Sequence, residues 1–518
     1  MTDSHDKEAE AKQAARSSSL DISPDELRAI SESATEIVED YFARVASLPV
    51  FPDTDAEELS NLFTKKLSSE GEPVEKLMED CRRIVEKSRH NGHPRFWGYV
   101  ASPSTPVGAY ADLIASALNQ NVTSWRSAPA ATMIERQVVR WLGSLIGYDE
   151  NAHGLLTSGG SLANLNALYV AHRVKSSEEV SQFGLWNTGA PMTVYASDQV
   201  HFSIPKAADI LGLGREHVRT IGSDERFKMD MRALRERVEA DEREGFVPFC
   251  VVANAGTVNT GAIDPLADVG RFAKERGLWF HVDGAYGALG ALAQTKRTLF
   301  RGMERADSVS LDPHKWLYAP VDCGCLLFRN AEKVRSAWTQ HAADYIKVYE
   351  EKDEESFAFW DYGVELSRRF RALKIWLMLR YYGSRKVAEA ISDDCAMAQY
   401  FAEQIEAAED FELLAPTELS ICCFRYVPVE FPAKLQAASD EERAALNGKL
   451  DELNARIMHA IQRGGLAYLS NATLLGRFAL RACITNFRTT RADIDLTLKI
   501  IRDAAREVRK EQSETETF

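Results

Sequence analysis

Residues 308–316 read SVSLDPHKW, and this stretch is central to the interpretation of the chain. Its first four residues are typical of a short buried strand, after which Pro313 turns the chain and Lys315 follows at the strand end. A lysine amine in such a place forms an imine with an aldehyde when a cofactor site surrounds it. An isolated lysine is more often a solvated surface residue, so the catalytic interpretation depends on the other motifs.

A second stretch, WFHVDGAYG at residues 279–287, ends an apolar strand with a carboxylate. A buried aspartate needs a cationic partner, and a protonated pyridinium nitrogen is a partner that draws electrons from a bond being broken. Asp283 is the candidate, with a helix cap or a salt bridge as the alternative for any single aspartate. The small residues Gly284, Ala285 and Gly287 favour close approach by a flat ligand.

Two further motifs precede these in the chain. GLLTSGGSLAN at residues 154–164 places glycines and hydroxyls before an expected helix, where backbone N–H groups and the helix dipole attract a phosphate. SDQVHFS at residues 197–203 carries His201, which is suited to stacking on a ring or relaying a proton. A glycine-rich helix start is common and a single histidine is most often structural, so the four motifs together carry the argument.

The pattern of apolar runs predicts an α/β fold. From residue 101 to 385 short apolar runs alternate with helical stretches, which indicates a mostly parallel central sheet with helices on both faces. The expected strands are 193–197, 246–254, 278–282, 308–311 and 325–328. The expected divisions are a disordered tail at 1–22, an N-terminal helical segment at 23–100, a large domain at 101–385 and a small C-terminal α+β domain at 386–518.

The formal net charge of −15 argues against nucleic acid or an anionic membrane surface as the main partner. The sequence contains no run of 18 apolar residues, so we expect no membrane-spanning helix. The polar N-terminus lacks the apolar core of a secretory signal. The eight cysteines follow no metal-binding pattern, so we expect reduced thiols and no metal. These features predict a cytoplasmic protein that acts on a small molecule.

The motifs resemble those of the group II pyridoxal-phosphate (PLP) dependent amino-acid decarboxylases, which include aromatic-L-amino-acid, glutamate, histidine and diaminobutyrate decarboxylases. HVDGAYG and DPHKW are similar to the family's HVDAAY and NPHKW, and their 32-residue spacing also fits. Segments at 93–96, 119–121, 254–264 and 366–374 add to a resemblance that covers residues 25–505. The resemblance implies the PLP-dependent transferase fold (aspartate aminotransferase-like, fold type I), PLP as cofactor, an amino-acid substrate and a homodimer.

The resemblance also implies roles for the motif residues. Lys315 carries the cofactor as a Schiff base, Asp283 pairs with its ring nitrogen, and His201 stacks on the ring; these three are the expected catalytic residues. The other expected cofactor-binding residues are Ala285 on the opposite ring face, Thr257 at the ring's edge, and Gly160, Ser161, Ser308 and His314 at the phosphate. Asp312 stands where aromatic decarboxylases often carry asparagine, and a carboxylate there repels phosphate unless hydrogen bonds offset its charge.

The implied reaction removes CO₂ from an L-amino acid and leaves the amine. In plant and animal aromatic decarboxylases a lid tyrosine, nine residues before the first arginine of the RRF motif, protonates the product. Counting back from Arg368 puts Phe359 at that position, and phenylalanine there favours oxidative deamination to an aldehyde. We expect the lid at residues 341–366 and favour simple decarboxylation, with other candidate proton donors at Tyr345, Tyr349 and Tyr362.

The expected substrate pocket departs from that of aromatic decarboxylases. An isoleucine and a phenylalanine near the second subunit's entrance are replaced by Asn121 and Thr123, so acidic and basic amino acids are also candidate substrates. Trp97 and Tyr99 are the expected aromatic walls, together with Phe359. The alternative functions are a PLP aminotransferase or lyase of the same fold and a degenerate scaffold homologue. The DPHKW context and the intact motif residues favour a decarboxylase.

Overall fold

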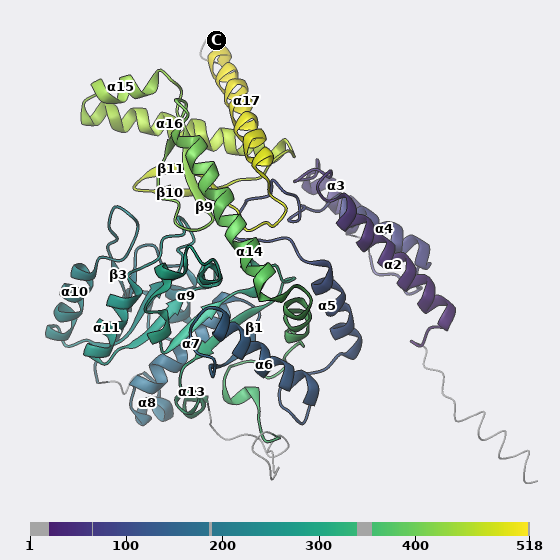
Figure 1. Ribbon diagram of the computed structural model, residues 1–518, viewed down its shortest axis with the longest axis vertical. Helices are drawn as coiled ribbons and strands as arrows, with labels where there is room; N and C mark the ends of the chain where they lie inside the picture. Colours follow the sequence, from purple (N-terminus) through teal and green to yellow (C-terminus); the bar gives the residue numbers. More distant parts are fainter. Residues whose placement is uncertain (1–19, 65, 186–188, 339–354, 516–518) are drawn as a thin grey trace, which may run out of the picture. The chain divides into compact units, whose positions relative to one another are not determined.

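The computed structural model describes residues 20–64, 66–185, 189–338 and 355–515 (Figure 1). The chain divides into one unit of Met1–Leu48 and Pro52–Arg89 and a second unit of Pro49–Phe51 and His90–Phe518. Residues 90–100, which the sequence assigned to the N-terminal helical segment, therefore belong to the second unit. The predicted tail at 1–22 lies almost wholly outside the described residues, as does most of the predicted lid.

The first unit contains three helices, α2 (Pro24–Arg44), α3 (Ala56–Phe63) and α4 (Val74–Glu86). Helix α2 begins with a capping box in which the Ser23 hydroxyl accepts from the Glu26 N–H and the Glu26 carboxylate accepts from the Ser23 N–H. Helices α2 and α4 pack together, yet Leu27, Leu77 and Ile84 leave apolar surface exposed on them.

The second unit is built on a seven-stranded sheet with the order β1-β7-β6-β5-β4-β2-β3. Its strands are β1 (His153–Thr157), β2 (Met192–Ser197), β3 (Val218–Ile221), β4 (Val247–Asn254), β5 (Trp279–Asp283), β6 (Ser308–Leu311) and β7 (Gly324–Phe328). Strand β7 runs antiparallel to both β1 and β6, and the remaining pairs are parallel. The predicted mostly parallel α/β sheet is confirmed, with one reversed strand.

Helices surround this sheet. They are α5 (Pro106–Leu118), α6 (Pro129–Leu145), α7 (Gly160–Lys175), α8 (Glu178–Phe183), α9 (Ser203–Ile210), α10 (Met231–Arg243), α11 (Leu266–Arg276), α12 (Pro313–Trp316) and α13 (Ala331–Trp338). Helix α7 crosses strands β4, β5, β6 and β7, whereas α10 and α11 pack on β3, β4 and β5. The N-terminus of α7 is thereby held beside the ends of the central strands.

A smaller antiparallel sheet with the order β10-β11-β9-β8 follows in the chain. Its elements are α14 (Ala372–Glu406), β8 (Phe411–Leu413), β9 (Ile421–Tyr426), α15 (Phe431–Ala437), α16 (Asp440–Arg463), β10 (Ser470–Leu474), β11 (Arg477–Cys483) and α17 (Arg491–Thr515). Helix α14 is kinked at Gly383, which has a φ of 71°. It packs on α5 and α6 and also on β8 and β9, so it joins the two sheets.

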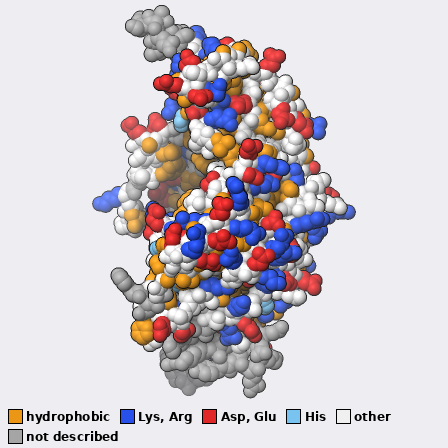
Figure 2. Space-filling view, turned by 90° about the vertical axis from the view of Figure 1, so that its left-hand side faces the viewer, with side chains coloured by type: hydrophobic (Ala, Val, Ile, Leu, Met, Phe, Trp, Pro, Cys, Tyr) orange, Lys and Arg blue, Asp and Glu red, His pale blue; other side chains and the backbone are white. Residues whose placement is uncertain are grey.

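The surface carries charges of both signs. Figure 2 shows acidic and basic side chains interspersed over one face of the molecule. That face therefore has no broad basic patch of the kind that nucleic acid needs. Within the described ranges, no helix is both long enough and apolar enough to cross a bilayer.

Candidate active site

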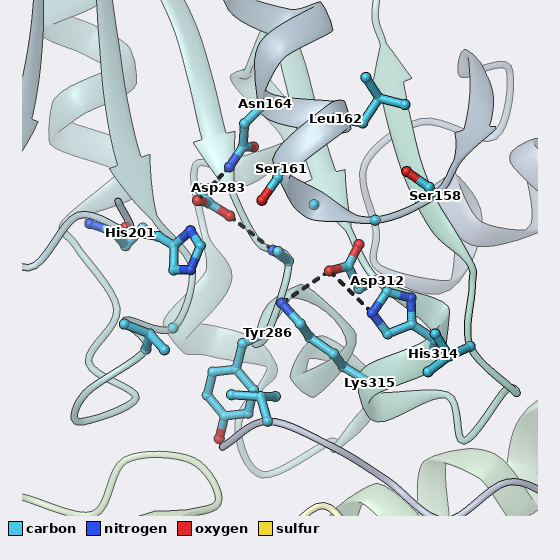
Figure 3. A pocket seen from close by; sticks show the side chains of 18 residues that line it. Ser158, Ser161, Leu162, Asn164, His201, Asp283, Tyr286, Asp312, His314 and Lys315 are labelled. Atoms are coloured by element: carbon cyan, nitrogen blue, oxygen red, sulfur yellow. Dashed lines mark hydrogen bonds and ion pairs between the residues drawn. The ribbon is translucent and has the colours of Figure 1, made fainter. Parts of the chain in front are cut away.

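The site lies where three neighbouring strands end. The register pairs Asn254 of β4 with Asp283 of β5, and Asp283 with Ser310 of β6, so these strand ends lie side by side. Ligands of open α/β sheets bind at this edge. A cavity of about 390 Å³ opens there (Figure 3). It is lined by Val100, Ser158, Gly159, Gly160, Ser161, Leu162, Asn164, His201, Asn254, Gly256, Val258, Asp283, Ala285, Tyr286, Asp312, His314, Lys315 and Val321.

Lys315 enters this cavity from the four-residue helix α12 (Figure 3). Its Nζ lies 3.0 Å from Asp312 Oδ2, and Nε2 of His314 lies 3.8 Å from the same oxygen. The Cys323 N–H donates to His314 Nδ1 at 3.1 Å, which leaves the imidazole proton on Nε2. Burial lowers the pKa of His314, so this ring is neutral near pH 7.

Asp283 faces the same cavity and is 6% exposed. Its carboxylate accepts from Asn164 Nδ2 at 2.8 Å, the Ala285 N–H at 3.1 Å and Ser310 Oγ at 3.2 Å. No lysine or arginine in the described ranges forms an ion pair with it. A buried carboxylate without a cationic side chain beside it suits a cationic ligand nitrogen. Lys315 and Asp283, 32 residues apart in the chain, therefore meet at one cavity (Figure 3).

A chain of hydrogen bonds runs behind Asp283. Trp279 Nε1 donates to Ser308 Oγ at 2.9 Å, and Ser308 Oγ lies 2.9 Å from His281 Nδ1. His281 Nε2 lies 3.0 Å from Asn164 Oδ1. Burial lowers the pKa of His281 to about 4, so the ring is neutral and donates from Nε2 to the asparagine oxygen. The relay fixes the Asn164 amide with its N–H₂ towards Asp283.

This relay corrects one prediction. Ser308 was expected at the phosphate, but it is fully buried, does not line the cavity and bonds to Trp279 and His281 instead. It begins β6, so it lies two residues, about 6.6 Å, behind Ser310 along the strand. Ser310, and not Ser308, reaches the strand end where Asp283 lies.

Glycines form the wall of the cavity at the N-terminus of α7. Helix α7 begins at Gly160, and the first N–H groups of a helix have no partner within it. A Cβ on Gly160 would lie 2.8 Å from the Ala285 Cβ and 2.9 Å from Asp312 Oδ2, so only glycine leaves this space open. Ser161 lines the same wall. Open backbone, a helix N-terminus and a hydroxyl fit a phosphate group.

Asp312 lies beside this wall and is 1% exposed. Its Oδ2 pairs with Lys315, while its Oδ1 has no hydrogen-bond partner among the described residues. The Asp283 carboxylate, the Lys315 amine and the glycine wall together fit PLP.

His201 and Ala285 also line the cavity. The Ser203 hydroxyl lies 2.8 Å from His201 Nδ1, and Asn164 Nδ2 donates to the same hydroxyl at 3.0 Å. Burial lowers the pKa of His201, which makes the ring neutral near pH 7 and able to lie flat against an aromatic ligand. Thr257, by contrast, is buried with its hydroxyl 2.9 Å from Thr260 Oγ1 and does not line the cavity, so its contact with the cofactor stays a prediction.

The predicted aromatic walls lie elsewhere. Trp97 is fully buried in the core of the smaller sheet, where it contacts Phe401 and donates from Nε1 to Thr489 at 3.0 Å. It is therefore no part of the pocket. Tyr99 does not line the cavity either; it is half exposed and its hydroxyl lies 3.1 Å from that of Tyr468. The adjacent Val100 is the residue of this segment that reaches the cavity.

Asn121, Thr123 and Phe359 form a separate cluster around Arg368. Asn121 Oδ1 accepts from the Arg368 N–H at 2.8 Å, and the Thr123 carbonyl accepts from the Phe359 N–H at 2.9 Å. The Phe359 ring is fully buried, with the Arg368 guanidinium carbon 4.1 Å from its centroid. Arg368 in turn pairs with buried Glu135. Phe359 is thus buried beside Arg368 and does not line the cavity, and its place over the substrate stays a prediction, since most of the predicted lid lies outside the described residues.

The other candidate proton donors of the predicted lid are three tyrosines. Tyr345 and Tyr349 lie outside the described residues. Tyr362 stacks on Phe357 with ring centroids 5.4 Å apart and does not line the cavity. Burial raises the pKa of Tyr362, which makes it a poorer proton donor.

The sequence motifs contained functional residues whose roles were not foreseen. Asn164 stands four residues after Gly160, so both lie on one face of α7, and this spacing was the available signal. Asn254 ends β4, Ser310 is the penultimate residue of β6, and both pair with Asp283. Tyr286 lines the cavity three residues after Asp283.

Comparison with known proteins agrees with this geometry. Residues 56–427 match the model of the pyridoxal-dependent decarboxylase conserved domain. Aromatic-L-amino-acid decarboxylase of Bacillus atrophaeus is 34% identical, covering 95% of this chain and 98% of that protein. Phenylacetaldehyde synthase of Petunia hybrida is 29% identical, covering 93% and 95%. The crystal structure of Oryza sativa TDC with PLP and tryptamine superposes with a TM-score of 0.86 at 28% identity, covering 95% and 99%. The chain belongs to the pyridoxal-dependent decarboxylase family, and its cofactor is PLP.

Proposed function

We propose that this protein decarboxylates an L-amino acid to the amine and CO₂, with PLP held on Lys315. The observation that carries the proposal is the meeting of the Lys315 amine and the Asp283 carboxylate at one cavity. When bound, PLP supplies a ring that accepts the electron pair of the breaking carbon–carboxylate bond. Asp283 keeps a proton on the ring nitrogen, because its buried charge is stabilised by that cation.

The remaining cavity residues position the reactants. The α7 N-terminus, Gly160 and Ser161 would hold the phosphate, and His314 would add a neutral N–H at the same end. His201 and Ala285 would lie against the ring. Lys315 would hold the cofactor through Nζ, and the free amine would carry a proton for the substrate.

The residues that line the cavity favour a substrate with an apolar or aromatic side chain. Val100, Leu162, Val258 and Val321 contribute apolar surface. Among the described lining residues, Lys315 is the sole lysine or arginine, so no second cation is available there for a distal carboxylate or sulfinate. An acidic substrate would bury an uncompensated charge, which costs several kcal/mol, on the order of the effective ion desolvation penalty.

Aldehyde formation is the second candidate activity, because a phenylacetaldehyde synthase is among the similar proteins. The sequence argument for it depended on Phe359, and that ring is buried beneath Arg368. Burial of Phe359 supports the amine as product. Measuring hydrogen peroxide and aldehyde against amine in one reaction decides between the two: stoichiometric peroxide would favour the aldehyde.

We also propose a homodimer in the cytoplasm. Exposed Leu27, Leu77 and Ile84 on α2 and α4 support a subunit contact, because apolar surface of this kind is stabilised by burial. All eight cysteines are free thiols, which supports a reducing compartment. Light scattering of the purified protein tests the dimer, and a monomer mass at micromolar concentration contradicts it.

A Lys315→Ala variant tests the catalytic proposal. We expect the visible absorbance of bound cofactor to change from that of a lysine-linked to a free aldehyde form, with CO₂ release lost across a panel of amino acids. Lys333→Ala is the control, since Lys333 is exposed and does not line the cavity. An unchanged cofactor spectrum in the Lys315 variant would overturn the proposal.

A further inference from the structure

A buried carboxylate outside the cavity accepts hydrogen bonds from the segment that carries Lys315. Asp394, on α14, is 2% exposed. Its Oδ2 accepts from Trp316 Nε1 at 2.9 Å and from the Tyr318 hydroxyl at 2.7 Å. These two donors are the first and third residues after Lys315, so one oxygen holds both sides of the turn that follows the lysine.

The backbone of that segment is held by other bonds: the His314 N–H donates to the Cys323 carbonyl and the Thr105 N–H donates to the Tyr318 carbonyl, each at 3.2 Å. The hydrogen bonds of the Trp316 and Tyr318 side chains go to Asp394. Helix α12 spans only Pro313–Trp316, and no side chain caps its N-terminus. Trp316 stacks on Tyr286, a cavity residue, with centroids 5.2 Å apart and an interplanar angle of 10°. A change in the direction of the Trp316 ring is therefore transmitted to the cavity wall and to the Lys315 backbone.

Tyr318 needs such a restraint. Its φ is 57°, a left-handed conformation that bulky residues rarely adopt. A mostly apolar cavity of about 160 Å³, lined by Thr105, Met378 and Phe487 among others, lies beside its ring. The ring packs edge-on against Phe487, with centroids 5.2 Å apart and an interplanar angle of 87°, and the hydroxyl bond to Asp394 fixes its far end.

Asp394 also ties this segment to the C-terminal part of the chain. Its Oδ1 accepts from the Asn486 N–H at 3.2 Å, and the Asn486 side chain donates to the His93 carbonyl at 2.8 Å. Burial raises the pKa of Asp394 to about 7, and the bonds from Tyr318 and Trp316 oppose that rise. Burying this carboxylate is unfavourable, so its presence indicates that the side chains it binds, Trp316 and Tyr318, must be held in place.

We propose that Asp394 is a positioning residue that sets the direction of Lys315 in the cavity by holding Trp316 and Tyr318. The inference rests on the proposed role of Lys315 as the cofactor lysine. No contact joins Asp394 to the cavity lining directly; its effect is carried by the two aromatic side chains.

Asp394→Asn in the full-length holoenzyme is the test. The amide has the same shape but a single acceptor oxygen, so its NH₂ group must face either the Asn486 N–H or the Trp316 and Tyr318 donors, which then lose their acceptor. We expect kcat to fall about 10- to 100-fold with KM changed much less, because a small misplacement of a reacting group is felt in the chemical step. We also expect a changed visible circular dichroism of bound PLP, a signal that needs no substrate.

Asp241→Asn is the matched control. Asp241 is fully buried and accepts from the Tyr195 hydroxyl at 2.8 Å and from Arg219 at 3.1 Å, all outside the cavity lining. We expect this variant to lose thermal stability, while its kcat and cofactor dichroism stay within about twofold of wild type. The reason is that Asp241 shares no partner with the cavity residues, and such sites act independently. Equal behaviour of the two variants would overturn the inference.

Tyr318→Phe provides a second route if Asp394→Asn does not fold. It removes one hydroxyl and keeps the ring, and we expect the same dichroism change at smaller amplitude. In the double variant the two effects on kcat should not add, because both act through one bond; full additivity would contradict the inference. If wild-type protein itself shows no lysine-linked cofactor band, the proposed role of Lys315 fails, which is a distinct outcome.

Discussion

Replacing Ser308 with alanine separates two roles for this hydroxyl. The motif comparison assigned it to the phosphate, whereas the structure buries it between Trp279 Nε1 and His281 Nδ1, each 2.9 Å away. Ser308→Ala leaves the Trp279 N–H and the His281 ring nitrogen without partners. The orientation of Asn164, and through it Asp283, then loses its support.

The two roles predict effects of different size on different quantities. A buried polar group left unsatisfied costs about 1–3 kcal/mol, so two such groups should lower the free energy of unfolding by about 2–6 kcal/mol. A lost hydrogen bond to a charged phosphate would instead cost about 1.5–3 kcal/mol of PLP binding, which is more than tenfold in affinity.

Urea unfolding of the apoprotein measures the first quantity. The ratio of the affinities for PLP and for pyridoxal, which lacks the phosphate, measures the second. We expect unfolding to be destabilised and the affinity ratio to stay within about threefold of wild type. Ser161→Ala, on the cavity wall, is the control that should reduce the ratio. Unchanged stability together with a collapsed ratio for Ser308→Ala would refute the reasoning.

Three further expectations follow from the same structure. Gly160→Ala should weaken PLP binding at least about tenfold by equilibrium dialysis, because the new Cβ would lie 2.8 Å from that of Ala285; unaltered affinity would contradict the glycine wall. Phe359→Tyr should leave the amine-to-aldehyde ratio unchanged, since the ring is buried beneath Arg368; a product switch would contradict this. Burial lowers the pKa of His281 from an ordinary 6.5 to about 4, so the unfolded state binds the proton more tightly. The free energy of unfolding should therefore decline as pH falls from about 6.5 towards 4, and less steeply in His281→Gln; equal slopes would contradict this assignment.

Five of the seven strands of the large sheet were predictable from short, mostly apolar runs, whereas β1 and β3 were not predicted because their sequences HGLLT and VRTI contain too few apolar residues. The expected strand at 308–311 coincides with β6, and that at 325–328 differs from β7 by one residue. The reversed direction of β7 was not predictable, because an apolar run carries no record of its direction. Tertiary pairing decides it.

The site was predictable where a motif residue ends a strand or begins a helix, as with Asp283, Lys315 and Gly160. It was not predictable where the role depends on depth along an element, as with Ser308. The burial of Phe359 was not predictable, because counting residues across a loop does not fix which side chain is buried. Asp394 lies 78 residues from Trp316 in a helix with no motif, so only the fold brings it to the Lys315 segment.

Borohydride reduction of the PLP-loaded protein tests the central claim most directly, because it fixes the cofactor to the amine that holds it. Trypsin does not cleave after a modified lysine, so the account predicts one phosphopyridoxyl peptide spanning residues 306–329, with the added mass on Lys315. Label on a different lysine, or none on a protein that still binds PLP, would contradict it.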